Sequence, residues 1–207
     1  MARCLVDALD YLHNSVNIVH RDIKPCNVLL DESGAPLLVD FGKAVALQTG
    51  HVDLTRGNDM TTSIEGTYTF LPPECCSSDG FDFEQKPYSM KKADVWALGV
   101  TLYILTYNRF PYELTPMTDG HCTTELDIME AIANVDVQFS DSERPVSSEL
   151  KQLLAQMLEK DPDRRPDINN IKTFSKFLTE EPVIKRRCLS SNFFSIHSLF
   201  PEQTDPK

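Results

Sequence analysis

The stretch IVHRDIKPCNVLLDESGAPLLVDFGKA, residues 18–44, holds the features that decide the fold and the chemistry of this chain. Asp22 follows a short β-branched run, and Asp40 ends a second short apolar run. The segment DESGAP between them is typical of a turn, because Asp and Ser bond the local backbone, Gly permits positive φ and Pro ends a helix. We therefore predict a hairpin of residues 28–30 and 37–39, with the two carboxylates on neighbouring loops.

Outside this stretch the hydrophobic pattern is mainly helical. Residues 93–107 are nearly all apolar and predict a helix that is buried on every side. Residues 43–66 and 75–92 are polar and weakly periodic, which predicts long loops of the kind that are usually functional or mobile. Amphipathic helices are expected at residues 1–14, 124–134, 147–161 and 166–178, and a short strand at NIVH.

Composition is that of an ordinary globular protein. Of the 207 residues, 41% are hydrophobic and 25% are charged, so one large domain or two small ones can bury a sizeable core. The formal net charge of −11 argues against nonspecific binding to nucleic acid or to an anionic membrane. It also hints at basic substrates.

The cysteine pattern indicates a reducing compartment, and the apolar segments give no sign of secretion or membrane insertion. The cysteine spacing is irregular and lacks a C-x-x-C pair, so neither a zinc site nor a disulfide framework is predicted. The N-terminus lacks the apolar core of a signal peptide, and the longest apolar stretch, residues 95–107, is too short to cross a bilayer. We expect a cytoplasmic location, with the nucleus as a second compartment. Free thiols are expected at Cys4, Cys26, Cys75, Cys76, Cys122 and Cys188.

Four motifs in order along the chain resemble the C-terminal lobe of a eukaryotic protein kinase. They are HRDIKPCN (20–27), DFG (40–42), GTYTFLPPE (66–74) and ADVWALG (93–99). The resemblance covers residues 1–178 and implies a mainly α, kinase-like C-terminal lobe with a small β-hairpin region at the catalytic loop.

Residues 179–207 show no sustained period, and we expect this tail to be mostly disordered. The helix at residues 1–14 already follows its pattern at Met1. The resemblance therefore implies that the β-rich N-terminal lobe is absent from this sequence.

The residue types in the first two motifs suit phosphoryl transfer, which needs positioning and charge compensation more than covalent chemistry. The cofactors implied are ATP and Mg²⁺. Asp40 and Asn27 offer the oxygen ligands that Mg²⁺ prefers. Asp22 resembles the catalytic aspartate that orients the acceptor hydroxyl, and Lys24 can reach the γ-phosphate as a point charge. Leu29 is expected under the adenine ring, although an ordinary core leucine would look the same.

The lysine within DIKP is similar to that of serine/threonine kinases rather than tyrosine kinases, so the expected substrates are protein serine and threonine hydroxyls. Thr67 resembles the residue that contacts the catalytic aspartate in serine/threonine kinases. Arg21 resembles an arginine that pairs with a phosphate on the activation loop. The loop offers Thr61, Thr62 and Ser63 to an upstream activating kinase, and the alternative is a plain solvated loop.

Other residues resemble structural members of the family. His20 and Phe41 resemble members of a stacked spine, and Gly42 completes the DFG motif. Asp94 resembles the aspartate that holds the catalytic loop backbone. The last two, Glu74 and Arg165, match a buried ion pair that joins the loop end to the late helices.

Two finer resemblances concern the subfamily and the tail. ADVWALGVTLYILTYNRFPY and the long insert before it are similar to calcium/calmodulin-dependent protein kinase kinases. Residues 183–200 mix basic and apolar side chains, which can mark a calmodulin-type target helix. A disordered tail with a few hydrophobic residues explains the same segment.

Two functions follow from these observations. The first is a serine/threonine protein kinase, because the set Asp22, Lys24, Asn27 and Asp40 is intact. The second is a catalytically inactive fragment or a kinase-like binding and regulatory module, because no glycine-rich loop or strand lysine precedes the catalytic loop in this sequence.

Overall fold

The computed structural model describes residues 1–47, 59–76, 86–112, 124–139 and 145–179. Helices dominate this part of the chain, and its strands are two or three residues long. The helices are α1 (Ala2–Asp10), α2 (Met90–Tyr107), α3 (Glu125–Asn134), α4 (Ser148–Met157), α5 (Ile168–Phe174) and α6 (Lys176–Thr179), with a π-helical turn η1 (Tyr11–Ser15) after α1.

The strands form three separate antiparallel pairs. β2 (Val28–Leu30) pairs with β3 (Pro36–Leu38), β1 (Ile18–Val19) with β4 (Val45–Ala46), and β5 (Met60–Thr61) with β6 (Tyr88–Ser89). Three 3₁₀ turns complete the described elements, namely η2 (Pro25–Asn27), η3 (Tyr68–Phe70) and η4 (Pro73–Cys75).

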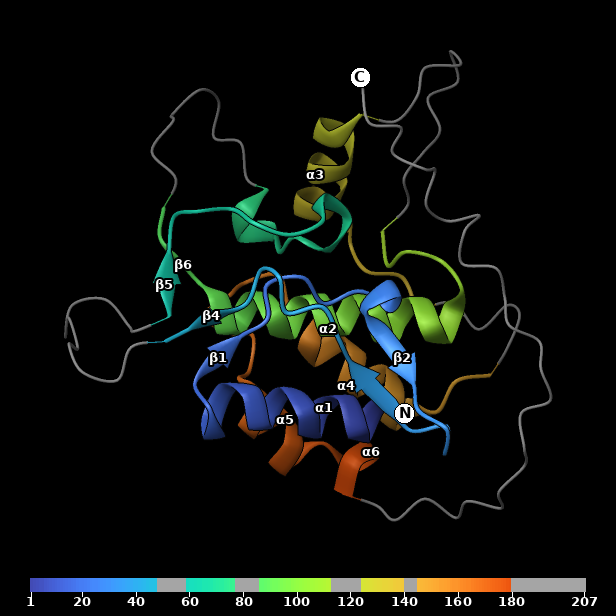
Figure 1. Ribbon diagram of the computed structural model, residues 1–207. Helices are drawn as coiled ribbons and strands as arrows, with labels where there is room; N and C mark the ends of the chain where they lie inside the picture. The colour runs from blue at the N-terminus through green and yellow to red at the C-terminus, as the bar shows by residue number, and fades with distance from the viewer. Residues whose placement is uncertain (48–58, 77–85, 113–123, 140–144, 180–207) are drawn as a thin grey trace, which may run out of the picture.

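The buried helix α2 crosses the middle of the molecule (Figure 1). Its start is capped by Ser89, whose hydroxyl accepts a hydrogen bond from the Lys92 amide. Its end is closed by Asn108, which adopts the left-handed conformation and donates its amide hydrogen to the Ile104 carbonyl. Helices α1, α5 and α6 lie on one side of α2 and α3 lies on the other (Figure 1). α2 itself contacts α4, β1, β6 and the turns η2 and η3.

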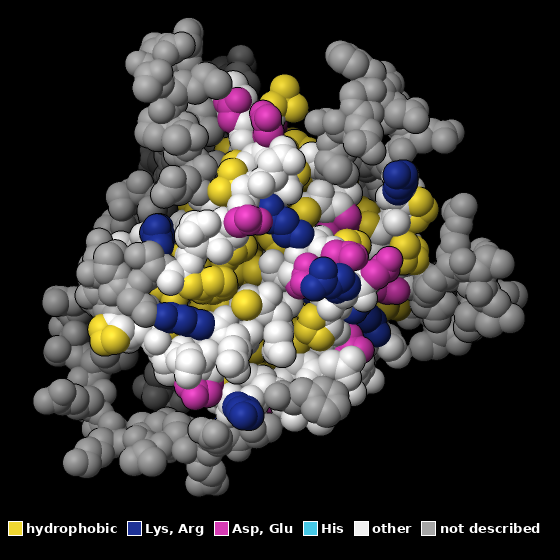
Figure 2. All heavy atoms as spheres, turned by 180° about the vertical axis from the view of Figure 1, so that it is seen from behind, with side chains coloured by type: hydrophobic (Ala, Val, Ile, Leu, Met, Phe, Trp, Pro, Cys, Tyr) yellow, Lys and Arg dark blue, Asp and Glu magenta, His cyan; other side chains and the backbone are white. Residues whose placement is uncertain are grey.

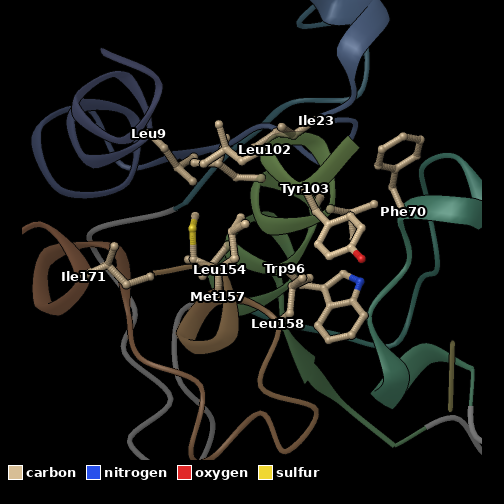
Figure 3. Close-up of a cluster of buried hydrophobic side chains, with 14 of the residues drawn as sticks. Leu9, Ile23, Phe70, Trp96, Leu102, Tyr103, Leu154, Met157, Leu158 and Ile171 are labelled. Atoms are coloured by element: carbon tan, nitrogen blue, oxygen red, sulfur yellow. The ribbon is translucent and has the colours of Figure 1, made fainter. Parts of the chain in front are cut away.

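The core is formed where α1, α2, α4 and α5 meet. The side chains around α2 point toward one another from all of these helices (Figure 3). α2 and α4 approach closely at Gly99, where an added Cβ would lie 2.8 Å from the Cβ of Met157. The labelled core side chains are Leu9, Ile23, Phe70, Trp96, Leu102, Tyr103, Leu154, Met157, Leu158 and Ile171.

The predicted hairpin is confirmed, with a shift of one residue in its second strand. Leu29 pairs with Leu37. The turn between the strands is closed by Asp31, whose Oδ1 accepts hydrogen bonds from Ser33 and from the Ala35 amide. Gly34 takes a φ of 80°, as the sequence pattern required.

Two of the predicted loops contain structure that the sequence pattern did not reveal. The segment 43–66 includes β4 and β5, and the segment 75–92 includes β6 and the first turn of α2. These strands have only two residues each, which is too short for a period of two to be visible in the sequence.

Two helix predictions were wrong in extent. The helix predicted at 147–161 is capped by Ser147 and ends at Met157. The helix predicted at 166–178 is two helices, because Ser175 adopts an extended backbone between α5 and α6. The helices expected at 93–107 and 124–134 are present as α2 and α3. α2 is not buried on every side as predicted, because Leu105 in its last turn is exposed.

The surface of the described residues mixes charged and apolar side chains. From behind, acidic and basic side chains lie beside one another, with hydrophobic side chains exposed among them (Figure 2). None of the described helices is long and apolar enough to cross a membrane.

The four described cysteines are free thiols, as expected. Cys4 and Cys26 are exposed, and Cys75 and Cys76 are buried. Burial, together with the charge of Glu74, raises the pKa of Cys76 to about 12, so this thiol stays protonated at neutral pH. Cys122 and Cys188 lie outside the described residues.

Candidate active site

Asp22 lies in the loop after β1 and is held by polar groups on both carboxylate oxygens. The hydroxyl of Thr67 donates to Oδ1 over 2.9 Å, and Nζ of Lys24 lies 3.0 Å from Oδ2. Lys24 also donates to the Thr67 hydroxyl over 3.0 Å, so the three side chains form a closed set of contacts. A further cation, Lys43, places its Nζ 3.9 Å from Oδ2.

These contacts keep Asp22 ionised. Burial by itself works to raise the pKa of this carboxyl. The hydrogen bonds from Lys24 and Thr67 and the positive charges of Lys24 and Lys43 outweigh burial, so the pKa of Asp22 is below its ordinary value. At neutral pH the side chain is therefore a carboxylate that can accept a hydrogen bond from an incoming hydroxyl.

Asn27 is fixed against the same loop. Pro25 starts the turn η2, and the Asn27 amide hydrogen bonds to the Lys24 carbonyl over 2.9 Å. Its side-chain Nδ2 donates to the backbone carbonyl of Asp22 over 2.8 Å. This orientation leaves Oδ1 of a buried amide as an oxygen of the kind that Mg²⁺ prefers.

The turn that carries Asp40 lies against the loop that carries Asp22. Val39, the residue before it, donates its amide hydrogen to the Asn27 carbonyl over 2.9 Å, and its carbonyl lies 3.1 Å from Nε2 of His20. The Lys43 contact with Asp22 lies three residues beyond Asp40. Residues on both sides of Asp40 thus touch the loop that carries Asp22.

The backbone at Asp40 is strained, with a φ of 65°. Its Oδ1 accepts a hydrogen bond from the Gly42 amide over 3.2 Å. A Cβ at Gly42 would lie only 3.2 Å from that oxygen, so glycine suits this turn. Non-glycine residues at positive φ often occur where function fixes the direction of a side chain.

The donor set fits a magnesium ion bound together with phosphate. Asp40 supplies a carboxylate and Asn27 an amide oxygen, and Mg²⁺ commonly uses one or two protein carboxylates with substrate phosphates and water as its remaining ligands. The described residues contain no cluster of three or more His, Cys, Asp or Glu side chains that would hold a metal by itself.

Asp94 of α2 holds the backbone of the loop directly before Asp22. Its Oδ2 accepts from the His20 amide over 2.7 Å, and its Oδ1 accepts from the Arg21 amide over 2.8 Å. The ring Nε2 of His13 lies 2.9 Å from Oδ2. Arg21 has a φ of 67°, and the two hydrogen bonds to Asp94 stabilise this unfavourable conformation directly before Asp22.

His20 and Phe41, the predicted members of a stacked spine, are in ring contact. Their ring centroids lie 4.9 Å apart. His20 is buried, whereas Phe41 is 46% exposed. Leu29 is also about half exposed and lies on β2, so it presents an apolar surface rather than joining the core.

Arg21 contacts the loop that carries the candidate phosphorylation residues. Its Nη2 donates to the Ser63 carbonyl over 3.2 Å, and the Tyr88 hydroxyl donates to the same carbonyl over 2.9 Å. The Thr61 hydroxyl accepts from the Ser63 amide over 3.1 Å. Thr62 and Ser63 are exposed, so the segment is accessible to solvent while its backbone is held.

The ion pair between Glu74 and Arg165 is present and bidentate. Nη1 and Nη2 of Arg165 lie 2.8 Å from the two carboxylate oxygens of Glu74. Arg165 is fully buried, and its guanidinium lies over the ring of Trp96 at 5.1 Å from the centroid. The same group donates to the carbonyls of Lys92, Glu159 and Lys160.

Sequence reasoning missed Lys43, His13 and Tyr88. His13 carried a signal, since a histidine on the apolar side of a helix needs a polar partner when it is buried. Lys43 and Tyr88 carried none, because only the folded chain brings them to Asp22 and Ser63. The proposed calmodulin-type segment, residues 183–200, lies outside the described residues.

Comparison with known proteins gives a consistent result. A family model described as protein kinase domain matches residues 1–177. The serine/threonine-protein kinase TOS3 of Saccharomyces cerevisiae (strain YJM789) is 30% identical over 94% of this chain and 34% of its own length. TOUSLED of Arabidopsis thaliana is 33% identical over 79% of this chain and 22% of its own length, and ssp1 of Schizosaccharomyces pombe is 34% identical over 82% and 24%. The chain spans about a third or less of the length of these curated relatives.

Proposed function

The chain belongs to the protein kinase domain family, and from this premise we propose that it transfers the γ-phosphoryl group of Mg-ATP to serine or threonine hydroxyls of proteins. One observation carries the proposal. The Asp22 carboxylate is held by Lys24 and Thr67 beside Asn27 and the turn of Asp40. The serine/threonine kinases to which the chain is similar support the acceptor class.

The side chains take distinct roles in this proposal. Asp22 is ionised, so its carboxylate orients the acceptor hydroxyl and receives its proton as the phosphoryl group is transferred. Lys24 places a positive charge between Asp22 and Thr67 that can also reach the γ-phosphate. Asn27 and Asp40 would hold Mg²⁺, which neutralises charge on the phosphate oxygens.

We propose further that residues 1–178 form a C-terminal kinase lobe. The exposed apolar side chains of the β2–β3 hairpin support this, because further protein or an adenine ring can cover them. Leu29 and Leu37 are paired across the two strands and both are exposed. In this arrangement Leu29 lies under the adenine.

Several finer assignments stay proposals. Similarity to calcium/calmodulin-dependent protein kinase kinases rests on the motif around α2, and the calmodulin-type contact rests on the composition of residues 183–200. A cytoplasmic or nuclear location rests on composition alone. The predicted tail at 179–207 lies outside the described residues except for Thr179, which ends α6. Phosphorylation of Thr61, Thr62 or Ser63 by an upstream kinase is supported by the contact of Arg21 with the Ser63 carbonyl.

The decisive experiment measures transfer of labelled phosphate from Mg-ATP to protein and peptide acceptors. The full-length protein is purified as wild type and as the variant Asp22→Asn. The substitution keeps the shape but removes the charge, so we expect at least a hundredfold lower kcat, in line with the usual size of general acid–base contributions. Retained transfer in Asp22→Asn would contradict the role of this carboxylate.

The exposed apolar surface also favours a second candidate, a kinase-like module that binds a partner protein without catalysis. Titration calorimetry of the 207-residue chain with Mg-ATP separates the two. Micromolar affinity that is lost in Asp40→Asn favours the kinase. Undetectable binding by the wild-type chain favours the module.

A further inference from the structure

Lys43 is a second cation at the candidate catalytic carboxylate. Its Nζ lies 3.9 Å from Oδ2 of Asp22, the same oxygen that Lys24 contacts at 3.0 Å. Two lysines therefore face the same oxygen of one carboxylate.

The two lysines differ in what they can still bind. Lys24 is 22% exposed and already donates to both Asp22 and Thr67. Lys43 is 41% exposed, and among the described residues its only charged partner is Asp22, at a distance beyond a hydrogen bond. An ammonium group has three N–H donors, so Lys43 can bind a further anion without leaving Asp22.

The base of the Lys43 side chain is fixed in space. The turn that contains it is closed by a hydrogen bond from the Ala44 amide to the Phe41 carbonyl, 3.0 Å long. β4 follows directly and pairs with β1, the strand that leads into the Asp22 loop. The aliphatic stem is therefore anchored beside Asp22, and the side chain is partly exposed to solvent.

Resting on the phosphotransfer function above, we propose that Lys43 selects acceptor proteins by binding an acidic side chain, Glu or Asp, next to the acceptor serine or threonine. The acceptor hydroxyl must come within hydrogen-bond distance of Asp22. Successive residues of an extended chain lie about 3.3 Å apart, with side chains on alternating faces. A Glu or Asp beside the acceptor therefore starts within a few ångströms of Asp22, and the long, partly exposed Lys43 side chain can turn toward it. A basic neighbour would meet two lysines and is disfavoured.

The first test compares acceptor peptides that differ only at the residues on either side of the acceptor, with Glu, Gln or Lys there. We expect kcat/KM for the Glu peptide to exceed that for the Gln peptide about threefold, the size expected for a partly exposed ion pair. The Lys peptide should be the poorest, and the preference should fall as salt is added, because screening weakens exposed pairs.

The variant Lys43→Met should lose the difference between the Glu and Gln peptides, and Lys43→Glu should favour the Lys peptide. Lys172→Met is the matched control. Lys172 is 43% exposed and also pairs with carboxylates, but its partners, Asp7 and Asp10, lie on α1. This control should keep the wild-type preference.

A binding measurement makes the proposal independent of catalysis. Fluorescent peptides with Ala in place of the acceptor are titrated with the 207-residue chain at low salt. We expect the Glu peptide to bind about threefold more tightly than the Gln peptide, and this difference to vanish in Lys43→Met.

The outcomes separate the two proposals. Two results would overturn the role of Lys43 and leave the kinase function standing. One is transfer to all peptides with equal kcat/KM, and the other is a Lys43→Met effect that is confined to the KM for Mg-ATP. Absence of transfer together with a Lys43-dependent preference in binding overturns the kinase function and supports the acidic-segment site. Absence of both overturns both.

Discussion

At the scale of single residues, Thr67 connects the parts of the candidate site. Its hydroxyl donates to Asp22 and accepts from Lys24, so it fixes the carboxylate and the ammonium group in one geometry. Gly66 before it has a φ of 120°, and a Cβ there would lie 2.9 Å from the Arg21 carbonyl. Glycine therefore allows the loop to come close enough for Thr67 to reach Asp22.

Thr67→Val removes this hydroxyl and keeps the volume of the side chain. We expect kcat to fall about fivefold, the usual net effect of one hydrogen bond. The Thr67 hydrogen bond lowers the pKa of Asp22, so its loss raises that pKa, and the acid limb of the pH–kcat profile should move to higher pH. The measurement is kcat as a function of pH for wild type and variant.

The matched control is Thr69→Val in the adjacent turn η3. The Thr69 hydroxyl is buried and has no hydrogen-bond partner within the described part of the chain. Its removal should leave the pH profile unchanged. An identical acid limb in Thr67→Val and wild type would show that the hydroxyl does not act on Asp22.

At the scale of secondary-structure elements, the packing of α2 on α4 is set by Gly99. An added Cβ would lie 2.8 Å from the Cβ of Met157 and 3.1 Å from Cδ2 of Leu158. The backbones of the two helices therefore approach more closely than any side chain at this position allows. Because α2 also carries Asp94, this contact helps to position the helix that holds the loop before Asp22.

Gly99→Ala should destabilise the protein although alanine is the better helix former. Helix propensity favours alanine by about 1 kcal/mol, whereas overpacking in a core costs about 1–3 kcal/mol. We expect a net loss of about 1 kcal/mol in the free energy of unfolding, measured by urea denaturation. Leu105→Ala, at an exposed position of the same helix, is the control and should change stability less. A Gly99→Ala protein as stable as wild type would mean that the helices can move apart at no cost.

At the scale of the whole molecule, Glu74 and Arg165 join segments that are far apart in sequence. Glu74 lies in the turn η4, Arg165 lies between α4 and α5, and the guanidinium also bonds the Lys92 carbonyl in α2. The Lys92 side chain in turn donates to the Arg165 carbonyl. One buried side chain thus holds the loop end, the central helix and the late helices together.

Arg165→Met should lower the free energy of unfolding by about 3–5 kcal/mol, because it leaves the Glu74 carboxylate without its buried partner. The neighbouring residue supplies the control. Arg164 is mostly exposed and lies 3.4 Å from Glu159, so Arg164→Met should cost at most about 1 kcal/mol. Chemical denaturation of both variants measures the difference, and equal effects would contradict the structural role of the buried pair.

Local sequence determined the hairpin, the capped helices and the identity of the polar residues. The β2–β3 pair follows from the turn DESGAP at 31–36, and the serine pair 147–148 offers a cap for α4, because these signals act over a few residues. The break at Ser175 and the strands β4, β5 and β6 could not be predicted, since two-residue strands form only when the fold brings their partners alongside.

The sequence alone determined the candidate side chains for the proposed phosphoryl transfer, since the motifs HRDIKPCN and DFG contain Asp22, Lys24, Asn27 and Asp40. Only the tertiary structure decided that Lys43 approaches Asp22 and that His13 supports Asp94, because these contacts join residues that no local pattern relates. The physical reason is the distance along the chain over which each interaction acts. Turn and capping preferences act between close neighbours in the chain, whereas the charge around a carboxylate depends on every segment that folding packs against it.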